Sequence, residues 1–115
     1  MYDERALARA AGYGIDAQLQ ALDDELTRVH DVVHVEYDIR DWPEIPYVIL
    51  VIKYAIRADR PDYFEARATQ RREISAVCSA HDLFPTGDTW EDMGEHWYVV
   101  RRAGQSWIRN YSKTR

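Results

Sequence analysis

The densest group of side chains that could do chemistry lies between residues 86 and 96. Within nine residues the chain carries four carboxylates and a histidine: Asp88, Glu91, Asp92, Glu95 and His96. Oxygen ligands at this density can gather a hard cation such as Mg²⁺ or Ca²⁺, but the spacing does not follow that of an EF-hand loop. We expect an acidic loop over residues 86–95, and a solvated loop that neutralises the basic C-terminus is a simpler interpretation than a metal site.

Two other groups have types and spacing that bear on catalysis. Cys78 and His81 are three residues apart on one helix, which is half of a zinc site at most, so we expect Cys78 in the core and His81 partly buried. Glu36, Asp38 and Lys53 form a trio that a nuclease could use, although alternating charges on a solvated strand are common. Nucleotide-binding and zinc-protease motifs are missing from the sequence. We therefore assign no catalytic residue, no metal ligand and no cofactor.

Aromatic residues provide the remaining candidates for recognition. The chain has four tryptophans and eight tyrosines, and we expect Trp42, beside Pro43, and Trp90, among the acids, to be partly exposed. Tryptophan and tyrosine are enriched in the hot spots of protein interfaces. The sequence thus predicts a binding surface that combines these two aromatics with the acidic group: Trp42, Asp88, Trp90, Glu91, Asp92, Glu95 and His96.

The charge is negative overall and unevenly distributed. The net charge of −5 makes nucleic acid an unlikely main partner, because phosphate neutralisation needs clustered Lys and Arg. Residues 16–44 carry nine acids against two arginines, and residues 82–96 carry five acids and no Lys or Arg. Residues 101–115 carry five basic residues and no acid. Such segregation either neutralises itself between neighbouring elements or steers a charged partner.

Length and composition predict one domain over residues 1–115, with a frayed tail from about residue 112. The single cysteine, Cys78, is typical of a reducing compartment. The N-terminal residues lack the pattern of a signal peptide, and the longest apolar run, Tyr47 to Ile52, is too short to cross a bilayer. We therefore expect a cytoplasmic protein with no membrane contact.

The first half of the chain has clear periodicities. A short helix is expected over residues 3–11, and a second begins at Asp16, which could cap it. The second helix has one apolar stripe at steps of four and three, made of Ile15, Leu19, Leu22, Leu26 and Val29. Residues 33–40 then alternate between apolar and polar, as in a half-buried strand. Residues 47–56 are apolar on both faces, which predicts a central strand that forms a hairpin with the preceding one.

The second half is less regular. We expect a long helix over residues 61–84, stopped by Pro85, with Phe64, Cys78 and Phe84 on its inner side and Arg67 and Gln70 mostly elsewhere. After the acidic loop, residues 96–102 have strand composition. A turn at 103–104 and a weaker final strand over 105–111 complete the expected elements.

Together these elements predict an α+β two-layer sandwich. Two main helices would lie on one face of a four-stranded, mostly antiparallel sheet in the order α-β-β-α-β-β, after a short extra N-terminal helix. The other sheet face would stay open and carry His34, Glu36, Asp38 and Arg40. The second α-β-β unit could be a degenerate echo of the first.

These features favour a non-enzymatic protein-interaction module with an acidic surface, acting as a homodimer or with another protein. Small immunity and inhibitor proteins share this charge and size, and nothing more. The alternative is a small metal-assisted hydrolase or ligand-binding protein that uses residues 86–96. A weaker third interpretation is an RNA platform on the last two strands, supplied with charge by Arg101, Arg102 and Arg109.

Overall fold

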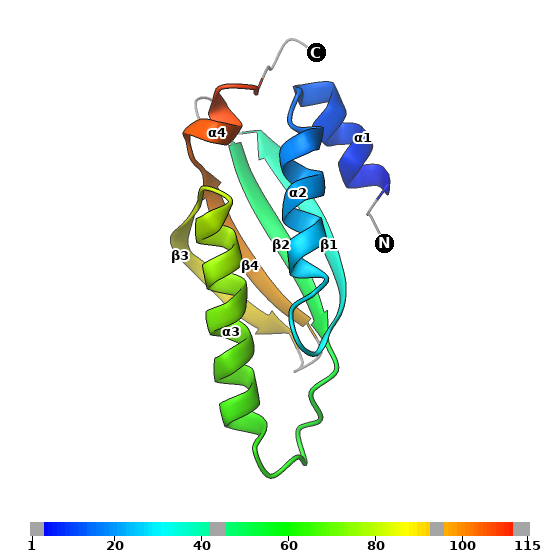
Figure 1. Ribbon diagram of the computed structural model, residues 1–115, viewed down its shortest axis with the longest axis vertical. Coiled ribbons are helices and arrows are strands. Elements are labelled where there is room, and N and C mark those ends of the chain that lie inside the picture. The colour runs from blue at the N-terminus through cyan, green and yellow to red at the C-terminus, as the bar shows by residue number, and fades with distance from the viewer. Residues whose placement is uncertain (1–3, 42–45, 93–95, 112–115) are drawn as a thin grey trace.

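The computed structural model describes residues 4–41, 46–92 and 96–111, and within them it leaves aside the side chains of residues 40, 41, 46–51, 54, 87–92 and 96. Eight elements follow one another along the chain, and Figure 1 shows their arrangement. They are α1 (Glu4–Tyr13), α2 (Asp16–Leu26), β1 (Val32–Asp41), β2 (Pro46–Tyr54), α3 (Tyr63–Ala80), β3 (Leu83–Asp92), β4 (His96–Ala103) and α4 (Gln105–Ile108). The predicted tail beyond residue 111 lies outside the described residues.

The four strands form one sheet in the order β1-β2-β4-β3, and every neighbouring pair is antiparallel. The register aligns Val35 of β1 with Ile52 of β2 and Ile52 with Trp97 of β4, and all three side chains are buried. The predicted hairpin between the first two strands is therefore confirmed. The prediction that the strand with two apolar faces lies in the middle of the sheet is also confirmed, because β2 lies between β1 and β4.

Helices α2 and α3 cover the same face of the sheet, as Figure 1 shows. All five residues of the predicted α2 stripe are buried in the main hydrophobic cluster: Ile15, Leu19, Leu22, Leu26 and Val29. Burial of this apolar stripe supplies most of the free energy that holds α2 against the sheet. The α2 sequence is too short to form a stable helix on its own in water, so it depends on this packing. Asp16 does not cap α2, since the residue before the helix is Ile15 and no side chain caps it.

The fold repeats itself. The unit α2-β1-β2 is followed by α3-β3-β4, and the sheet order places β2 and β4 together in the middle with β1 and β3 outside. The two helices run in opposite directions over the sheet (Figure 1). A pseudo-twofold axis normal to the sheet, between β2 and β4, therefore relates the two units, as the suspected echo in the sequence implies.

Both edges of the sheet are guarded against pairing with another strand. At the β1 edge, α1 packs nearby and Arg9 lies 4.0 Å from the Asp38 carboxylate. At the other edge, β3 contains Pro85, which cannot donate a ladder hydrogen bond, and its register shifts between Pro85 and Thr89. Proline, bulges and covering segments are the usual devices that keep an edge strand from adding another chain.

Two neighbouring predictions are wrong where they meet. These are the helix expected over residues 61–84 and the acidic loop expected over residues 86–95. Helix α3 ends at Ala80, the chain turns through Asp82 at φ 60°, and β3 begins at Leu83. Pro85 thus lies inside a strand, which it tolerates because β3 is at the edge of the sheet. Pairing with β4 overrides the loop-like composition of residues 86–92.

The expected final strand over 105–111 and the turn at 103–104 are also wrong, because α4 occupies residues 105–108. Asp82 organises this end: its carboxylate Oδ2 accepts hydrogen bonds from Ser106 N at 2.9 Å and Ser106 Oγ at 3.0 Å. Its carbonyl accepts from Gly104 N at 2.8 Å. Trp107 is buried in the core, and its indole Nε1 donates to the His81 carbonyl at 2.6 Å.

We predict that Gly104→Ala destabilises the protein through a clash with Asp82. A Cβ at position 104 would overlap the Asp82 carboxylate, and such overpacking costs about 1–3 kcal/mol. Asp82→Gly removes the carboxylate, and glycine suits the positive φ at position 82. In this background Gly104→Ala should lower the free energy of unfolding by less than half as much. Urea unfolding of the four proteins in this cycle measures the coupling. Additive costs would show that the contact does not constrain position 104.

Candidate functional site

Five of the seven predicted binding residues lie on strands β3 and β4 and not on a loop. The backbone of β3 carries Asp88, Trp90, Glu91 and Asp92, and His96 begins β4 with Asp92 as its register partner. The side chains of these five residues lie outside the described part of the structure, as do Trp42 and Glu95 entirely. Their grouping into one surface therefore stays a prediction. Among the described residues, no group of three or more His, Cys, Asp or Glu is placed to hold a metal ion.

The other sequence candidates occupy structural positions. Cys78 is buried in the core cluster, and His81 Nε2 lies 3.1 Å from Glu25 Oε1, so the predicted packing of both residues is confirmed. In the nuclease-like trio, Lys53 is the register partner of His34 and sits diagonally from Glu36. Glu36 itself lies 3.3 Å from His34 Nε2. The RNA platform loses its second strand, because residues 105–108 form α4.

The sheet face opposite α2 and α3 is open among the described residues. On β1 it carries His34, Glu36 and Asp38, as predicted, each at least partly exposed, while the Arg40 side chain is not described. Further across the sheet it carries the apolar side chains of Val100 and Phe84. Val100 is 8% exposed without belonging to the main core cluster, and Phe84 is 44% exposed. Exposed Arg102 is the register partner of Phe84, and exposed Lys53 lies near the other end of the sheet.

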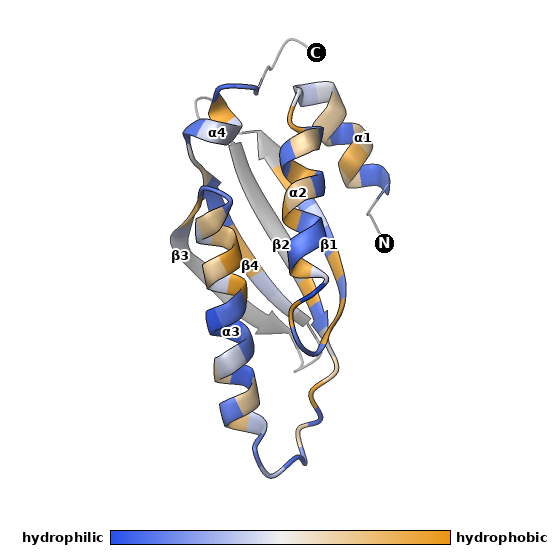
Figure 2. Ribbon diagram, in the orientation of Figure 1, coloured by the Kyte–Doolittle hydropathy of each residue, from blue (hydrophilic) through white to orange (hydrophobic). Residues whose placement is uncertain are grey.

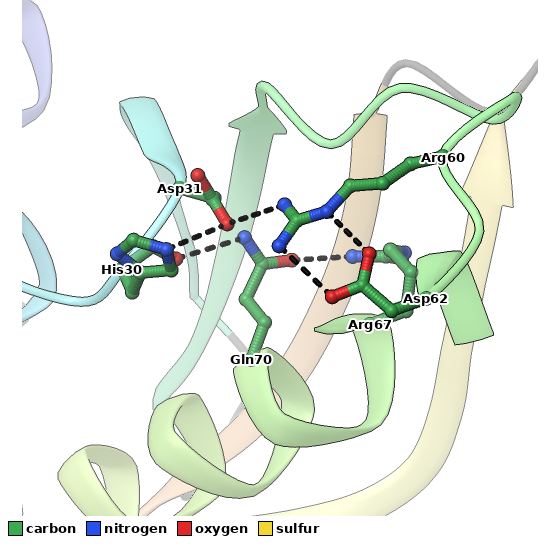
Figure 3. A network of polar contacts seen from close by, with 6 residues as sticks. All are labelled: His30, Asp31, Arg60, Asp62, Arg67 and Gln70. Carbon is green, nitrogen blue, oxygen red and sulfur yellow. Dashed lines mark hydrogen bonds and ion pairs between the residues drawn. The ribbon is translucent and has the colours of Figure 1, made fainter. Parts of the chain in front are cut away.

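A polar network fixes the start of α3 (Figure 3). Arg60 donates two hydrogen bonds to the Asp62 carboxylate, from Nε at 2.5 Å and from Nη2 at 3.0 Å. Arg60 Nη1 also lies 3.6 Å from Asp31 in the turn before β1, and His30 Nε2 is 3.1 Å from the same carboxylate. Asp31 has φ 64°, and its carbonyl accepts a hydrogen bond from Ala55 N. The loop before α3, whose part nearest the helix is mainly hydrophilic in Figure 2, is thereby tied to the start of the sheet.

The network continues into α3 through Gln70 and Arg67. Gln70 Nε2 donates to the His30 carbonyl at 3.3 Å, and Arg67 Nη1 donates to Gln70 Oε1. Both side chains are buried, contrary to the prediction that they point away from the core. The buried stripe of α3 is Arg67, Gln70, Ile74 and Cys78, at steps of three, four and four. That periodicity was present in the sequence, but two of its four members are polar.

Phe64, expected on the inner side of the helix, is instead the most exposed large apolar residue described, at 84%. The N-terminal end of α3 extends past the described strands of the sheet (Figure 1). Here the helix lines a surface hollow of about 410 Å³ with six residues: Tyr63, Phe64, Arg67, Ala68, Arg71 and Arg72. The hollow was missed in the sequence, where the signal is the recurrence of Phe64, Arg67, Ala68 and Arg71 along one side of the helix.

Burial and charge shift two pKa values. Burial raises the pKa of the Cys78 thiol to about 11, which the nearby Arg101 guanidinium only partly offsets. A hydrogen bond and the charge of Asp62 raise the pKa of Arg60, which therefore stays protonated. Arg101 is 7% exposed and donates from Nη2 to Ser75 Oγ at 3.2 Å, while its buried Nε has no hydrogen-bond partner. The thiol is thus neutral and protected, which is the opposite of a reactive cysteine.

The fold defines a two-layer α+β protein whose helices cover one face of the sheet and whose other face is covered by none of the described elements. Comparison of the chain with protein-family models, with curated proteins and with solved structures finds no match. None of the helices in the described part of the chain is long and apolar enough to cross a membrane.

We predict that Cys78 makes stability fall at alkaline pH. The folded pKa of about 11 lies above the ordinary thiol pKa of 9.0, so the folded state holds the proton more tightly than the unfolded chain. The contribution is complete below about pH 9 and is lost as the pH rises toward 11, with a limit of about 2–3 kcal/mol. Urea unfolding between pH 7 and 11 measures it. Cys78→Ala should show a smaller alkaline decline, and an unchanged decline would contradict the assignment.

Proposed function

We propose that this chain is a non-enzymatic protein-interaction module that pairs with a second copy of itself through the open face of its sheet. The observation that supports this most directly is the half-exposed ring of Phe84 on that face, which lies outside the main core cluster. Its register partner on β4 is the exposed Arg102. An exposed aromatic ring beside an arginine is typical of protein interfaces.

The state of the edges supports association through the face. Pairing of two chains edge to edge needs an exposed strand with free backbone groups. Here α1 flanks β1, and β3 carries Pro85 and a register shift. A partner that packs flat against the sheet meets neither obstacle, because sheet-on-sheet packing uses side chains alone.

The size of the face is adequate for a dimer. Four strands spaced by about 4.8 Å and eight residues at about 3.3 Å each give a projected area of roughly 500 Å². Side-chain relief makes the accessible area larger than the projection, which brings it near the roughly 800 Å² per partner of a standard interface. The charged residues also suit a rim, since Glu36 and Asp38 are acidic while Lys53 and Arg102 are basic.

Association through this face would leave the helical layer accessible. Asp24 and Glu25 of α2 are exposed on that layer. The acidic surface that the sequence predicts for a basic partner would therefore remain available in the dimer. Steering by such a surface weakens with salt, whereas contact between apolar sheet faces does not.

We predict that Phe84→Glu abolishes self-association. The substitution places a charge on the face at a position that is already half exposed, so the fold should tolerate it. Phe64→Glu is the matched control, since it makes the same change at the other exposed phenylalanine, on α3. Sedimentation equilibrium should show a dimer for the wild type and for Phe64→Glu, and a monomer for Phe84→Glu. A monomeric wild type at concentrations of about 100 μM would contradict the proposal.

A further inference from the structure

The two turns that join a helix to an edge strand are built alike. His30 and Asp31 lie between α2 and β1, and His81 and Asp82 lie between α3 and β3. Asp31 has φ 64° and Asp82 has φ 60°, and in the part of the chain that the structure describes no other residue except glycine has a positive φ. Each strand begins at the next residue. Glycine adopts this conformation at the least cost, so geometry alone does not require the same His-Asp pair at both turns.

Each of these aspartates accepts the same backbone hydrogen bond. The carbonyl of Asp31 accepts from Ala55 N at 2.9 Å, and the carbonyl of Asp82 accepts from Gly104 N at 2.8 Å. Ala55 is the first residue after β2, and Gly104 is the first after β4. The bond therefore joins the start of the outer strand to the end of the inner strand in both hairpins. The pseudo-twofold axis thus relates individual hydrogen bonds as well as whole elements.

The two main helices also make matching contacts across the axis. Gln18 of α2 and Gln70 of α3 each stand four residues before a buried apolar residue of the same helix. Gln18 Nε2 donates to the Ser106 carbonyl at 3.2 Å, and Gln70 Nε2 donates to the His30 carbonyl at 3.3 Å, the second of which is drawn in Figure 3. Each helix therefore binds the backbone of the other half of the molecule.

The connections after the inner strands lead to equivalent places. Residues 55–62 lead from the end of β2 to the start of α3. Residues 104–111 follow β4, and the ring of Tyr111 stacks on that of Tyr13, with centroids 5.0 Å apart. Tyr13 is the last residue of α1, and α2 begins at Asp16. The second connection thus runs back to the start of α2, so the two units form a ring that is open at this point.

We propose that this chain is a tandem duplication of one α-β-β unit, and that the binding partner of this unit is a second copy of itself. In the chain the two copies are fused: the inner strands β2 and β4 pair, and α2 and α3 cover the sheet together. The order of the units along the chain should then be interchangeable. None of the matching hydrogen bonds involves a side chain of the open sheet face, so the duplication is independent of the proposed dimer.

The test is a circular permutant that begins at Asp59, runs to Arg115, continues directly with Met1 and ends at Ala58. It exchanges the order of the units and opens an exposed connection, where the surface ion pair that it separates contributes little. The new junction must reach back along α1, a distance of about 15 Å. The seven residues between the last and the first described residue can span roughly 25 Å, so no linker is added.

The matched control is a permutant that opens the chain inside a unit, between Thr27 and Arg28 in the exposed turn after α2. Urea unfolding of the first permutant should show one cooperative transition, with an m-value within about 15% of the wild-type value. The midpoint of the control should fall by at least about twice as much, because α2 and the strands of its unit are then at opposite ends of the chain. A loss in the first permutant that equals or exceeds that of the control would overturn the proposal.

Amide hydrogen exchange of the wild-type chain tests the equivalence of the units without any change in sequence. The amides of Ala55 and Gly104 donate the two matching bonds, so both should be protected, with exchange rates within about tenfold of each other. Fast exchange at either amide would contradict a shared turn, whatever the stability of the permutants.

Discussion

The register of β1 beneath α2 is the constraint on which the rest of the structure depends. Val35, Tyr37 and Ile39 are buried against the helical layer, and the Tyr37 hydroxyl donates to the buried Asp23 of α2 at 2.5 Å. Because side chains alternate along a strand, a slip of one residue would expose this row and bury Glu36 and Asp38. The register that buries these residues in the core therefore also determines which residues lie on the open face. The charge of the open face thus follows from the packing of the face that the helices cover.

The two halves of the pseudo-twofold fold hold their helices differently. Helix α2 buries an apolar stripe, whereas α3 buries Arg67 and Gln70. Arg67 lies over the Trp97 ring of β4, and Ser75 of α3 accepts a hydrogen bond from Arg101 of the same strand. Buried guanidinium groups need hydrogen bonds and ring contacts in place of water, and they are fixed in position once these are made. In this account the second half gives up part of the stability of an apolar interface, and in exchange its buried polar side chains hold α3 in one position over the sheet.

The sequence predicted the first half well because its signals agree with one another. The α2 stripe, the alternation of β1 and the apolar β2 all indicate the elements that form. In the second half, Pro85 looked like a helix stop, and only pairing with β4 makes it part of an edge strand. Phe64 and Arg67 were assigned to the wrong sides of α3, because composition suggests a buried aromatic and an exposed arginine. Phe64 is exposed because the helix extends beyond the sheet, and Arg67 is buried because it lies over the Trp97 ring of β4. Both outcomes depend on three-dimensional packing that periodicity does not record.

The most direct test of association through the open face uses the fact that the chain has only two phenylalanines, Phe84 on that face and Phe64 on α3. With 4-fluorophenylalanine incorporated, ¹⁹F NMR should give two resonances, which the Phe64→Leu and Phe84→Leu variants assign. The account predicts that the Phe84 signal shifts with protein concentration and becomes shielded from a soluble gadolinium chelate, while the Phe64 signal stays unchanged. A Phe84 ring that is equally accessible to the chelate at every concentration would contradict it.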